Sequence, residues 1–386
     1  MTEDITTTGA IDADEDALLV LLAAGGGVAA RRRLLESHGT PAVALAAGAR
    51  DWRTHGLDDE QIAALQQPDA VRLGRDRAWL AASDHHLLGW HDPDYPALLR
   101  RIASPPLALF VAGDPGCLWH PSVAVVGSRS PSAGGGDNAY DFAQALAASG
   151  LAVTSGLAAG IDTAAHEGAL SVGGRTIAVL GTGPDVPYPR ANAGLHARIT
   201  GSGAVVSEHP PGTQPRRDQF PSRNRIIAGL SLGTLVVEAA ERSGALITAR
   251  MSTECGRDVF AVPGSIHNPL ARGCHRLIRE GAGLVESAAE VIAAIGPLAA
   301  ELADALRGRL GDPTCVQAKV GASAASWEPP DPDYQRLWQA LGHDPTGMDR
   351  LVTRTGLTAA ELSSMLLVME LDGRVAVEHG RYSRKH

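Results

Sequence analysis

The sequence predicts an α/β fold: a doubly wound, mostly parallel (Rossmann-like) sheet, with a small helical domain before it and a winged-helix domain after it. Between about residue 90 and residue 295, short apolar runs alternate with glycine-rich loops and amphipathic segments. Near-continuous apolar strands separated by helices are typical of a parallel sheet that is covered on both faces. Such sheets bind ligands beyond the carboxyl ends of their strands, so we expect the functional site there.

The expected strands of the central domain, which we place at residues 86–298, share an apolar run that ends in glycine or a polar residue. They are VAVVGSR (123–129), LAVTSG (151–156), TIAVLGTG (176–183), AVVSE (204–208), LGTLVVEA (232–239), DVFAVPG (258–264) and AGLV (282–285). The segment between the first two is amphipathic, because Phe142 and Leu146 recur at helical spacing before Gly150. We therefore expect helices as the crossover connections.

Two smaller domains flank the central one. Residues 1–15 are expected to form a disordered acidic tail, and residues 16–85 a helical domain with three glycines at 25–27. Two helices joined by a glycine-rich turn are the pattern of helix-hairpin-helix modules, although an ordinary turn explains the same glycines. Residues 299–328 are expected to be a linker. Residues 329–386 hold three helical segments and a short hairpin, which predict a winged helix.

Composition narrows the class of protein. No apolar stretch approaches the length that spans a membrane, and the acidic N-terminal residues lack the pattern of a secretory signal. The cysteines Cys117, Cys255, Cys274 and Cys315 lie far apart without metal-type spacing. We therefore expect free thiols, no metal, no cofactor and a cytoplasmic location.

The charge balance bears on nucleic-acid binding. The net charge of −9 over 386 residues opposes it, but DNA responds to the local field and not to the sum. Lysine occurs only at Lys319 and Lys385, so nearly all positive charge is arginine, which suits bidentate contacts with phosphate. The distribution of the arginines therefore decides whether a binding site exists.

Missing motifs exclude several enzyme classes. No Gly-Lys-Ser/Thr occurs, which excludes a Walker A loop and P-loop ATPase activity. The loop after the first expected strand lacks G-x-G-x-x-G, the fingerprint of NAD and FAD binding. H-E-x-x-H does not occur, and no G-x-S-x-G stands at an expected strand-to-helix turn.

The first candidate for an anion site is the loop GSRSPSAGGG, directly after the strand VAVV. Gly127 lets the backbone approach a ligand, and Ser128 and Ser130 supply hydroxyl groups. Arg129 adds a fixed charge beside the amides of the next helix N-terminus. An ordinary strand-to-helix turn is the alternative interpretation.

The second candidate is the loop of TSGLAAGIDTAAHEGAL (154–170). Ser155 and Gly156 are expected on the same sheet edge as Gly127. Asp162 is expected to be the N-cap of the helix that carries His166. We interpret His166 as a packed or capping histidine in preference to a catalyst.

The third candidate, residues 210–231, is basic within an acidic chain. Phe220 lies among four arginines, while Asp218 is the single acidic residue; the arginines are Arg216, Arg217, Arg223 and Arg225. Single-stranded nucleic acid needs positive charge for its phosphates and a ring face for a base. The alternative places Phe220 in the core and pairs the arginines with acids, and composition alone leaves both open.

Taken together, these segments resemble the DprA/Smf family of bacterial DNA-processing proteins. The matching stretches occur in the family's order, and FPSRNRIIAGLS is the most specific of them. The others are VVGSR, TSGLAAGID, VLGTGPDVPYPR, SEHPPG, ERSGALITA, GRDVFAVPG and LIREGA. The N-terminal part resembles the family's SAM-like or helix-hairpin-helix domain, and the C-terminal part resembles its winged helix.

The resemblance implies that the protein binds single-stranded DNA in natural transformation, protects it and loads RecA onto it, usually as a homodimer and without catalytic turnover. The motif match implies a nucleic-acid-binding set of Gly127, Ser128, Arg129, Ser130, Ser155, Gly156, Arg217, Phe220, Arg223, Asn224 and Arg225. Glycines 134–136 replace more usual polar residues, so we expect their helix to begin later. The resemblance leaves open whether the winged helix binds DNA or protein.

An enzyme is the alternative. The predicted domain is also similar to nucleotide phosphoribohydrolases with the signature P-G-G-x-G-T-x-x-E, and such a protein would bind or hydrolyse a nucleotide. Here the stretch reads AGLSLGTLVVE, which keeps Gly233, Thr234 and Glu238 but lacks Pro-Gly-Gly. Glu238 would be a base in such an enzyme, and we favour a salt bridge to an arginine of the third candidate instead.

Overall fold

A computed structural model describes residues 12–310, 332–341, 346–358, 362, 365–366, 369, 375–378 and 381–384. The chain divides into two compact units, residues 1–312 and residues 313–386, and each is described by itself. Within the described residues, no helix combines the length and the apolar character needed to cross a membrane. The first helix begins at Ala13, so the tail predicted to reach residue 15 was too long. Residues 1–11 of that tail lie outside the described residues.

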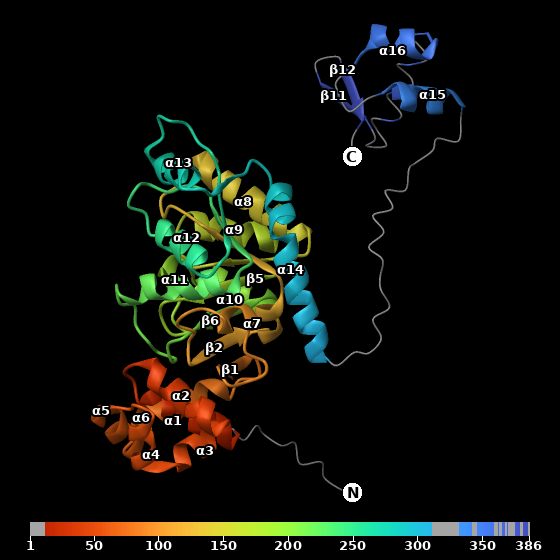
Figure 1. The fold of residues 1–386 in the computed structure, drawn as a ribbon. Helices are drawn as coiled ribbons and strands as arrows, with labels where there is room; N and C mark the ends of the chain where they lie inside the picture. The colour runs from red at the N-terminus through yellow and green to blue at the C-terminus, as the bar shows by residue number, and fades with distance from the viewer. Residues whose placement is uncertain are drawn as a thin grey trace, which may run out of the picture. The chain divides into compact units, whose positions relative to one another are not determined.

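The N-terminal part of the first unit is helical, as predicted (Figure 1). Its helices are α1 (Ala13–Ala23), α2 (Val28–His38), α3 (Pro41–Ala46), α4 (Gly48–Thr54), α5 (Asp59–Gln66) and α6 (Ala70–Leu80). Two buried polar side chains fix the glycine-rich turn between α1 and α2. Arg31 donates to the carbonyl oxygens of Leu21 and Gly26, and Gln61 donates to that of Gly25. That this turn meets a phosphate stays a prediction.

The central domain is built on a nine-stranded sheet with the order β1-β2-β6-β5-β4-β3-β7-β8-β9. The strands are β1 (His85–Gly89), β2 (Ala108–Gly113), β3 (Ser122–Val126), β4 (Ala152–Ser155), β5 (Thr176–Leu180), β6 (Ala204–Ser207), β7 (Gly233–Val236), β8 (Asp258–Ala261) and β9 (Gly283–Leu284). Strands β3 to β9 pair in parallel, which confirms the doubly wound sheet predicted from the apolar runs. The sequence interpretation missed β1 and β2, which extend the sheet in antiparallel fashion beside β6.

Helices cover both faces of the sheet, as the lack of polar alternation along its strands requires. In β3, Val123 and Val125 pack against α8 (Ala133–Ala148), α9 (Ile161–Ser171) and α14 (Ala288–Leu310). Ala124 and Val126 face the opposite cluster, which contains residues of α7 (Ala97–Arg100), α11 (Gln219–Leu230), α12 (Ala245–Glu254) and α13 (Arg272–Arg279). Successive strand residues point to opposite faces, so a continuous apolar run serves two cores. Helix α10 (Ala193–Ser202) packs on β5 and β6.

The boundary predicted at residue 298 was too early. Helix α14 continues to Leu310 and contains Pro297, and the buried Leu302 joins the core beneath α8 and α9. Arg101 also pairs with Glu301, at 2.6 Å. Residues 299–310 therefore belong to the first unit and not to a linker, while residues 311–328 lie outside the described residues.

The second unit has the winged-helix elements that the sequence predicts. They are α15 (Pro332–Ala340), β10 (Thr346–Gly347), α16 (Met348–Thr355), β11 (Val375–Glu378) and β12 (Arg381–Arg384), with the strand order β10-β12-β11. Leu337, Leu351, Leu366 and Val375 form its core. The predicted third helical segment, residues 358–373, lies only partly within the described residues.

Candidate nucleic-acid interface

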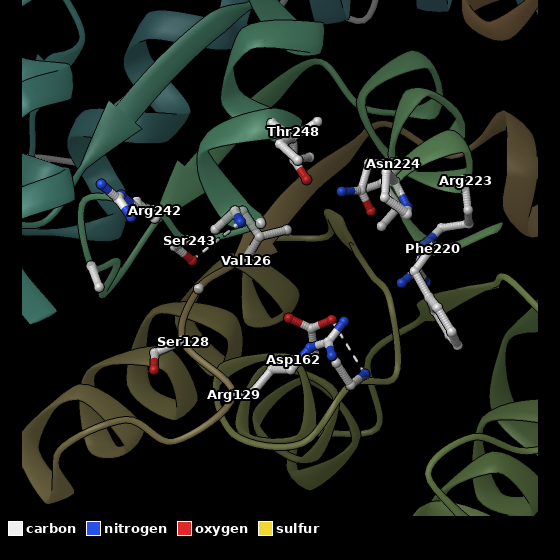
Figure 2. A pocket seen from close by; sticks show the side chains of 18 residues that line it. Val126, Ser128, Arg129, Asp162, Phe220, Arg223, Asn224, Arg242, Ser243 and Thr248 are labelled. Atoms are coloured by element: carbon white, nitrogen blue, oxygen red, sulfur yellow. Dashed lines mark hydrogen bonds between the residues drawn. The ribbon is translucent and has the colours of Figure 1, made fainter. Parts of the chain in front are cut away.

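A pocket of about 530 Å³ opens where the chain leaves β3, β4 and β7. Its lining comes from four segments that are far apart in the sequence (Figure 2). They contribute Val126, Gly127, Ser128 and Arg129; Ala158 and Asp162; Phe220, Pro221, Arg223, Asn224 and Ile227; and Ala240, Arg242, Ser243, Gly244, Ala245, Ile247 and Thr248. The site therefore lies at the carboxyl ends of parallel strands, where a doubly wound sheet is expected to bind ligands.

The loop after β3 is closely packed against the loop after β7. A Cβ on Gly127 would lie 2.6 Å from Ile161 and 2.8 Å from the Glu238 carbonyl oxygen, so only glycine fits without a shift. The Ser128 amide donates to that carbonyl oxygen at 2.7 Å. Ser132 caps α8 by accepting from the Gly135 amide. The helix begins at Ala133, so the prediction that the glycines at 134–136 delay it was wrong.

Glu238 holds this loop, and no arginine of the described residues pairs with its carboxylate. Its carboxylate accepts from the Ser132 amide at 2.8 Å, the Ser132 hydroxyl at 2.5 Å and the Asn268 amide group at 3.0 Å. A side chain on Gly135 would collide with the same carboxylate. The salt bridge predicted for Glu238 was therefore wrong, because hydrogen-bond donors of the loop engage both carboxylate oxygens.

Phe220 and Arg129 meet at one wall of the pocket. Phe220 is half-buried in the first turn of α11, and its ring centroid lies 5.1 Å from that of Tyr188 and 5.9 Å from the guanidinium carbon of Arg129. Tyr188 itself is 42% exposed, so this aromatic pair borders solvent. The ring is neither sealed in the core nor fully solvated. The sequence left open whether the Phe220 ring is available to a base or buried in the core, and the structure favours a ring that is partly accessible.

The opposite wall contains the exposed Arg242, which the sequence interpretation did not single out. It directly precedes Ser243, Gly244 and the start of α12, and all of these line the pocket. Within the part of the chain that the structure describes, neither Arg129 nor Arg242 has a carboxylate oxygen within 4.0 Å. The sequence signal that could have identified Arg242 is its place in the loop between β7 and α12. Arg129 has the corresponding place in the loop between β3 and α8.

Arg223 lines the pocket but points inward. It is 4% exposed, and one of its nitrogens donates to the carbonyl oxygens of Gly156, at 2.8 Å, and of Val179. Burial lowers the pKa of Arg223 to about 10, while the nearby Asp162 carboxylate opposes this shift. Arg223 therefore has a structural role, and its predicted contact with a phosphate stays a prediction.

Asp162 is not a helix N-cap, because Gly160 precedes α9 and Asp162 lies in its first turn. The Asp162 carboxylate accepts from the amides of Gly156, at 3.1 Å, and Ala158, at 3.3 Å. Burial raises the pKa of Asp162, and the charge of Arg223 works against that increase. Together the two side chains fix the loop that follows β4.

The remaining predicted site residues do not line the pocket. Ser155 is fully buried and donates to the Val125 carbonyl oxygen, and Gly156 is held by Asp162 and Arg223. Arg225 pairs with Glu208 at 2.5 Å, so its charge is neutralised. Ser130 and Arg217 are exposed outside the pocket lining. The pocket lining thus brings together Gly127, Ser128, Arg129, Phe220, Arg223 and Asn224, while the other five lie outside it and their part in DNA binding stays a prediction.

His166 is fully buried, as expected of a packed histidine. Its Nδ1 lies 2.7 Å from the Thr176 hydroxyl, which itself donates to the Val153 carbonyl oxygen at 2.7 Å. The hydroxyl has a single hydrogen, so His166 Nδ1 must be the donor to Thr176. Burial, with a smaller contribution from Arg223, lowers the pKa of His166 to about 3.

Comparisons with known proteins agree with this architecture. The family model described as DNA recombination-mediator protein A matches residues 86–296, and that of the DprA winged helix domain matches residues 321–381. Protein Smf of Synechocystis is 41% identical over 316 residues, which are 76% of this chain and 79% of the relative. DNA processing protein DprA of Streptococcus pneumoniae is 52% identical over 202 residues, which are 52% of this chain and 71% of that protein.

Two solved structures are similar as well. The X-ray structure of DNA processing protein A from Streptococcus pneumoniae superposes with a TM-score of 0.64 at 40% identity, covering 73% of this chain and 98% of the other. The structure of DNA processing protein A from Helicobacter pylori, which concerns the single-stranded DNA binding mode of that protein, gives a TM-score of 0.50 at 26% identity. It covers 56% of this chain and 96% of that one. The chain therefore belongs to the DprA/Smf family of DNA recombination-mediator proteins.

Proposed function

We propose that this protein binds single-stranded DNA in the pocket beyond β3, β4 and β7, as a recombination mediator without catalytic turnover. The observation that carries the proposal is the pairing of two arginines that lack salt-bridge partners among the described residues, Arg129 and Arg242, with the accessible ring of Phe220. Arginine attracts phosphates, and an aromatic face accepts a base without regard to its identity. The relative from Helicobacter pylori binds single-stranded DNA, which supports the assignment.

The acidic net charge does not oppose this proposal. The pocket lining holds Arg129, Arg223 and Arg242 but a single carboxylate, Asp162, which interacts more with the charge of Arg223 than with that of Arg129. A local cationic field therefore remains at the two accessible arginines, although the whole chain has a charge of −9. Duplex DNA offers no unstacked base to Phe220, so the site favours a single strand.

The test is fluorescence anisotropy of the full chain with labelled oligo-dT and with a duplex of equal length, at several salt concentrations. We expect tighter binding to the single strand than to the duplex. We also expect the affinity to fall as salt rises, with a slope of log K against log salt concentration of about −0.7 for each phosphate contact. Equal affinity for both DNAs, or no dependence on salt, would refute the proposal.

We further propose that the bound protein loads RecA onto the strand during natural transformation, and that it acts in the cytoplasm as a homodimer. Membership of a recombination-mediator family supports this role. It predicts that the protein accelerates DNA-dependent ATP hydrolysis by RecA on oligo-dT coated with single-strand-binding protein. An Arg129→Ala variant is expected to lose that acceleration in parallel with its DNA affinity. Light scattering coupled to gel filtration tests the dimer.

A further inference from the structure

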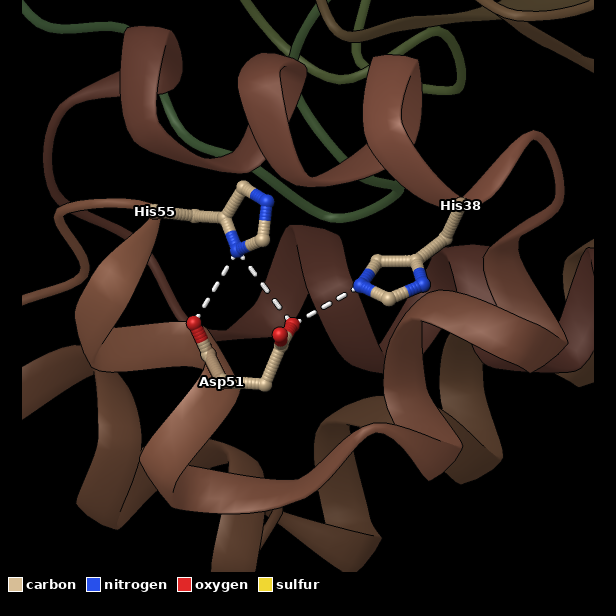
Figure 3. Close-up of side chains that lie close together, drawn as sticks. All are labelled: His38, Asp51 and His55. Atoms are coloured by element: carbon tan, nitrogen blue, oxygen red, sulfur yellow. Dashed lines mark hydrogen bonds and ion pairs between the residues drawn. The ribbon is translucent and has the colours of Figure 1, made fainter.

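We propose that His38, Asp51 and His55, in the N-terminal helical part, form a binding site for a zinc-type divalent transition metal (Figure 3). This assignment departs from the sequence expectation of no metal, which was drawn from the cysteine spacing and from the absence of H-E-x-x-H. The sequence signal is the spacing of Asp51 and His55, which places both on one face of a helix one turn apart. His38 comes from a different helix, so only the fold shows that it joins them.

The three side chains converge from two helices. His38 is the last residue of α2, Asp51 lies in the first turn of α4, and His55 directly follows α4. His38 Nε2 lies 2.8 Å and His55 Nδ1 3.2 Å from the same oxygen, Asp51 Oδ2. Figure 3 shows both imidazole rings turned toward this carboxylate. The three ligand atoms lie within 4.8 Å of one another.

These separations suit a tetrahedral ion. With bonds of about 2.0–2.2 Å to nitrogen and oxygen, neighbouring ligand atoms of zinc lie roughly 3.3–3.5 Å apart. The 3.2 Å distance from Asp51 to His55 is close to that value, and the 2.8 Å distance to His38 must lengthen when an ion enters. The side chains of His38, Asp51 and His55 are 21%, 34% and 20% exposed, so water has access as a fourth ligand.

The donor set determines the class of ion. Two imidazoles with one carboxylate favour zinc and its transition-metal neighbours, whereas magnesium and calcium prefer oxygen ligands throughout. Without a metal, both rings direct a nitrogen at one carboxylate oxygen, and His55 Nδ1 also lies 3.0 Å from the Asp51 carbonyl oxygen. With a metal, these nitrogens carry no hydrogen, and the ring hydrogens move to His38 Nδ1 and His55 Nε2.

The surrounding backbone is already fixed. Arg33, on α2, donates twice to the carbonyl oxygen of His55, at 2.9 and 3.1 Å. The middle of α2 and the C-terminal end of α4 are thereby held together before any ion binds, so the ligands lose little freedom on binding. A bound ion would link the same two helices a second time. Because the ion binds the folded state and not the unfolded chain, it would stabilise this part of the fold.

The experiment uses the full chain without a purification tag, after treatment with a chelator. We expect one equivalent of Zn²⁺ in calorimetric titration, and with Co²⁺ the intense visible absorption of a tetrahedral site with nitrogen and oxygen ligands. Both signals are expected to be lost in His38→Ala and in His55→Ala. The control His267→Ala removes an exposed histidine of the loop after β8 and is expected to bind like the wild type.

The proposal is overturned by a lack of stoichiometric binding to the wild type, or by equal binding by the wild type and both histidine variants. Because either variant removes a side chain that also bonds to Asp51, circular dichroism of each must first match the wild type. Asp51→Asn, which preserves shape but removes the charge, is expected to weaken Co²⁺ binding at least tenfold. Unchanged binding by this variant counts equally against the site.

Discussion

The guanidinium carbon of Arg129 lies 5.9 Å from the centroid of the Phe220 ring, although the loop after β3 and the first turn of α11 are almost a hundred residues apart. A cation over an aromatic face is attracted by the ring, which holds the guanidinium near the path of a strand that stacks on Phe220. This pair separates the electrostatic and stacking contributions to DNA binding into two side chains that can be changed independently.

Arg129→Ala is expected to weaken binding of oligo-dT by about 1.5–3 kcal/mol, the contribution of a hydrogen bond to a charged group. Because one phosphate contact is lost, the slope of log K against log salt is expected to fall by about 0.7. The matched control is Arg198→Ala, which removes a surface arginine paired with Glu167 away from the pocket lining. Equal losses in both variants, measured by anisotropy, would show that only net charge matters.

Phe220→Leu is expected to cost about 1–3 kcal/mol of oligo-dT affinity, because leucine fills the space beside Tyr188 but offers no π-face to a base. The salt dependence is expected to stay unchanged, since no phosphate contact is removed. Anisotropy gives both quantities, and a thermal melt checks that the fold is intact. Wild-type affinity in a folded variant would exclude base stacking on this ring.

The sheet was predictable because its strands are buried on both faces and therefore read as continuous apolar runs. The edge strands β1 and β2 were missed for a related reason. The sequence of β2, ALFVAG, is equally apolar and buried, but it precedes the alternating pattern and pairs antiparallel, so no βαβ spacing marks it. Local periodicity predicts an element, whereas its place in a sheet depends on contacts distant in sequence.

The site was predictable at the level of loops but not of side chains. The sequence placed Arg129 in a glycine-rich loop and Phe220 and Arg223 in a basic segment, but it did not distinguish an accessible guanidinium from a buried one. Arg223 and Arg225 are two positions apart on α11, yet the first bonds to backbone carbonyls and the second to Glu208. These partners come from other strands and loops, so only the folded chain shows them.

Arg223→Met is expected to lower the free energy of unfolding by about 1.5–3 kcal/mol, because it leaves the buried carbonyl oxygens of Gly156 and Val179 without their charged donor. It also removes a positive charge near the buried Asp162, so the double variant with Asp162→Asn is expected to lose less than the sum of the single variants. Denaturation by urea measures all three. A stable Arg223→Met variant with a reduced salt slope in DNA binding would instead show direct phosphate contact.

Glu238→Gln is expected to destabilise the protein by about 1.5–3 kcal/mol, because the amide group replaces an acceptor that takes hydrogen bonds from Ser132 and Asn268. We expect no release of base from a nucleoside monophosphate by the wild type or by this variant. The assay is chromatography of the reaction mixture after long incubation. Release by the wild type that disappears in a folded Glu238→Gln variant would establish the hydrolase alternative.

His166 is expected to make the protein less stable as the solution is acidified. The folded state holds this histidine neutral, with a pKa of about 3, because its ring is buried, while the unfolded chain protonates it near 6.5. Between these values the unfolded state binds one proton more, so the free energy of unfolding falls as pH decreases, by up to about 1.36 kcal/mol per pH unit from this residue. Above pH 7 this contribution is constant.

The measurement is urea denaturation of the wild type and of His166→Gln between pH 4 and pH 8. Glutamine is expected to lower stability at pH 7, because it cannot reproduce the donor to Thr176 in the same position. It is nevertheless expected to give a shallower slope between pH 4 and pH 6.5, since it has no ring to protonate in the unfolded state. Parallel curves for the two proteins would mean that other groups cause the acid sensitivity.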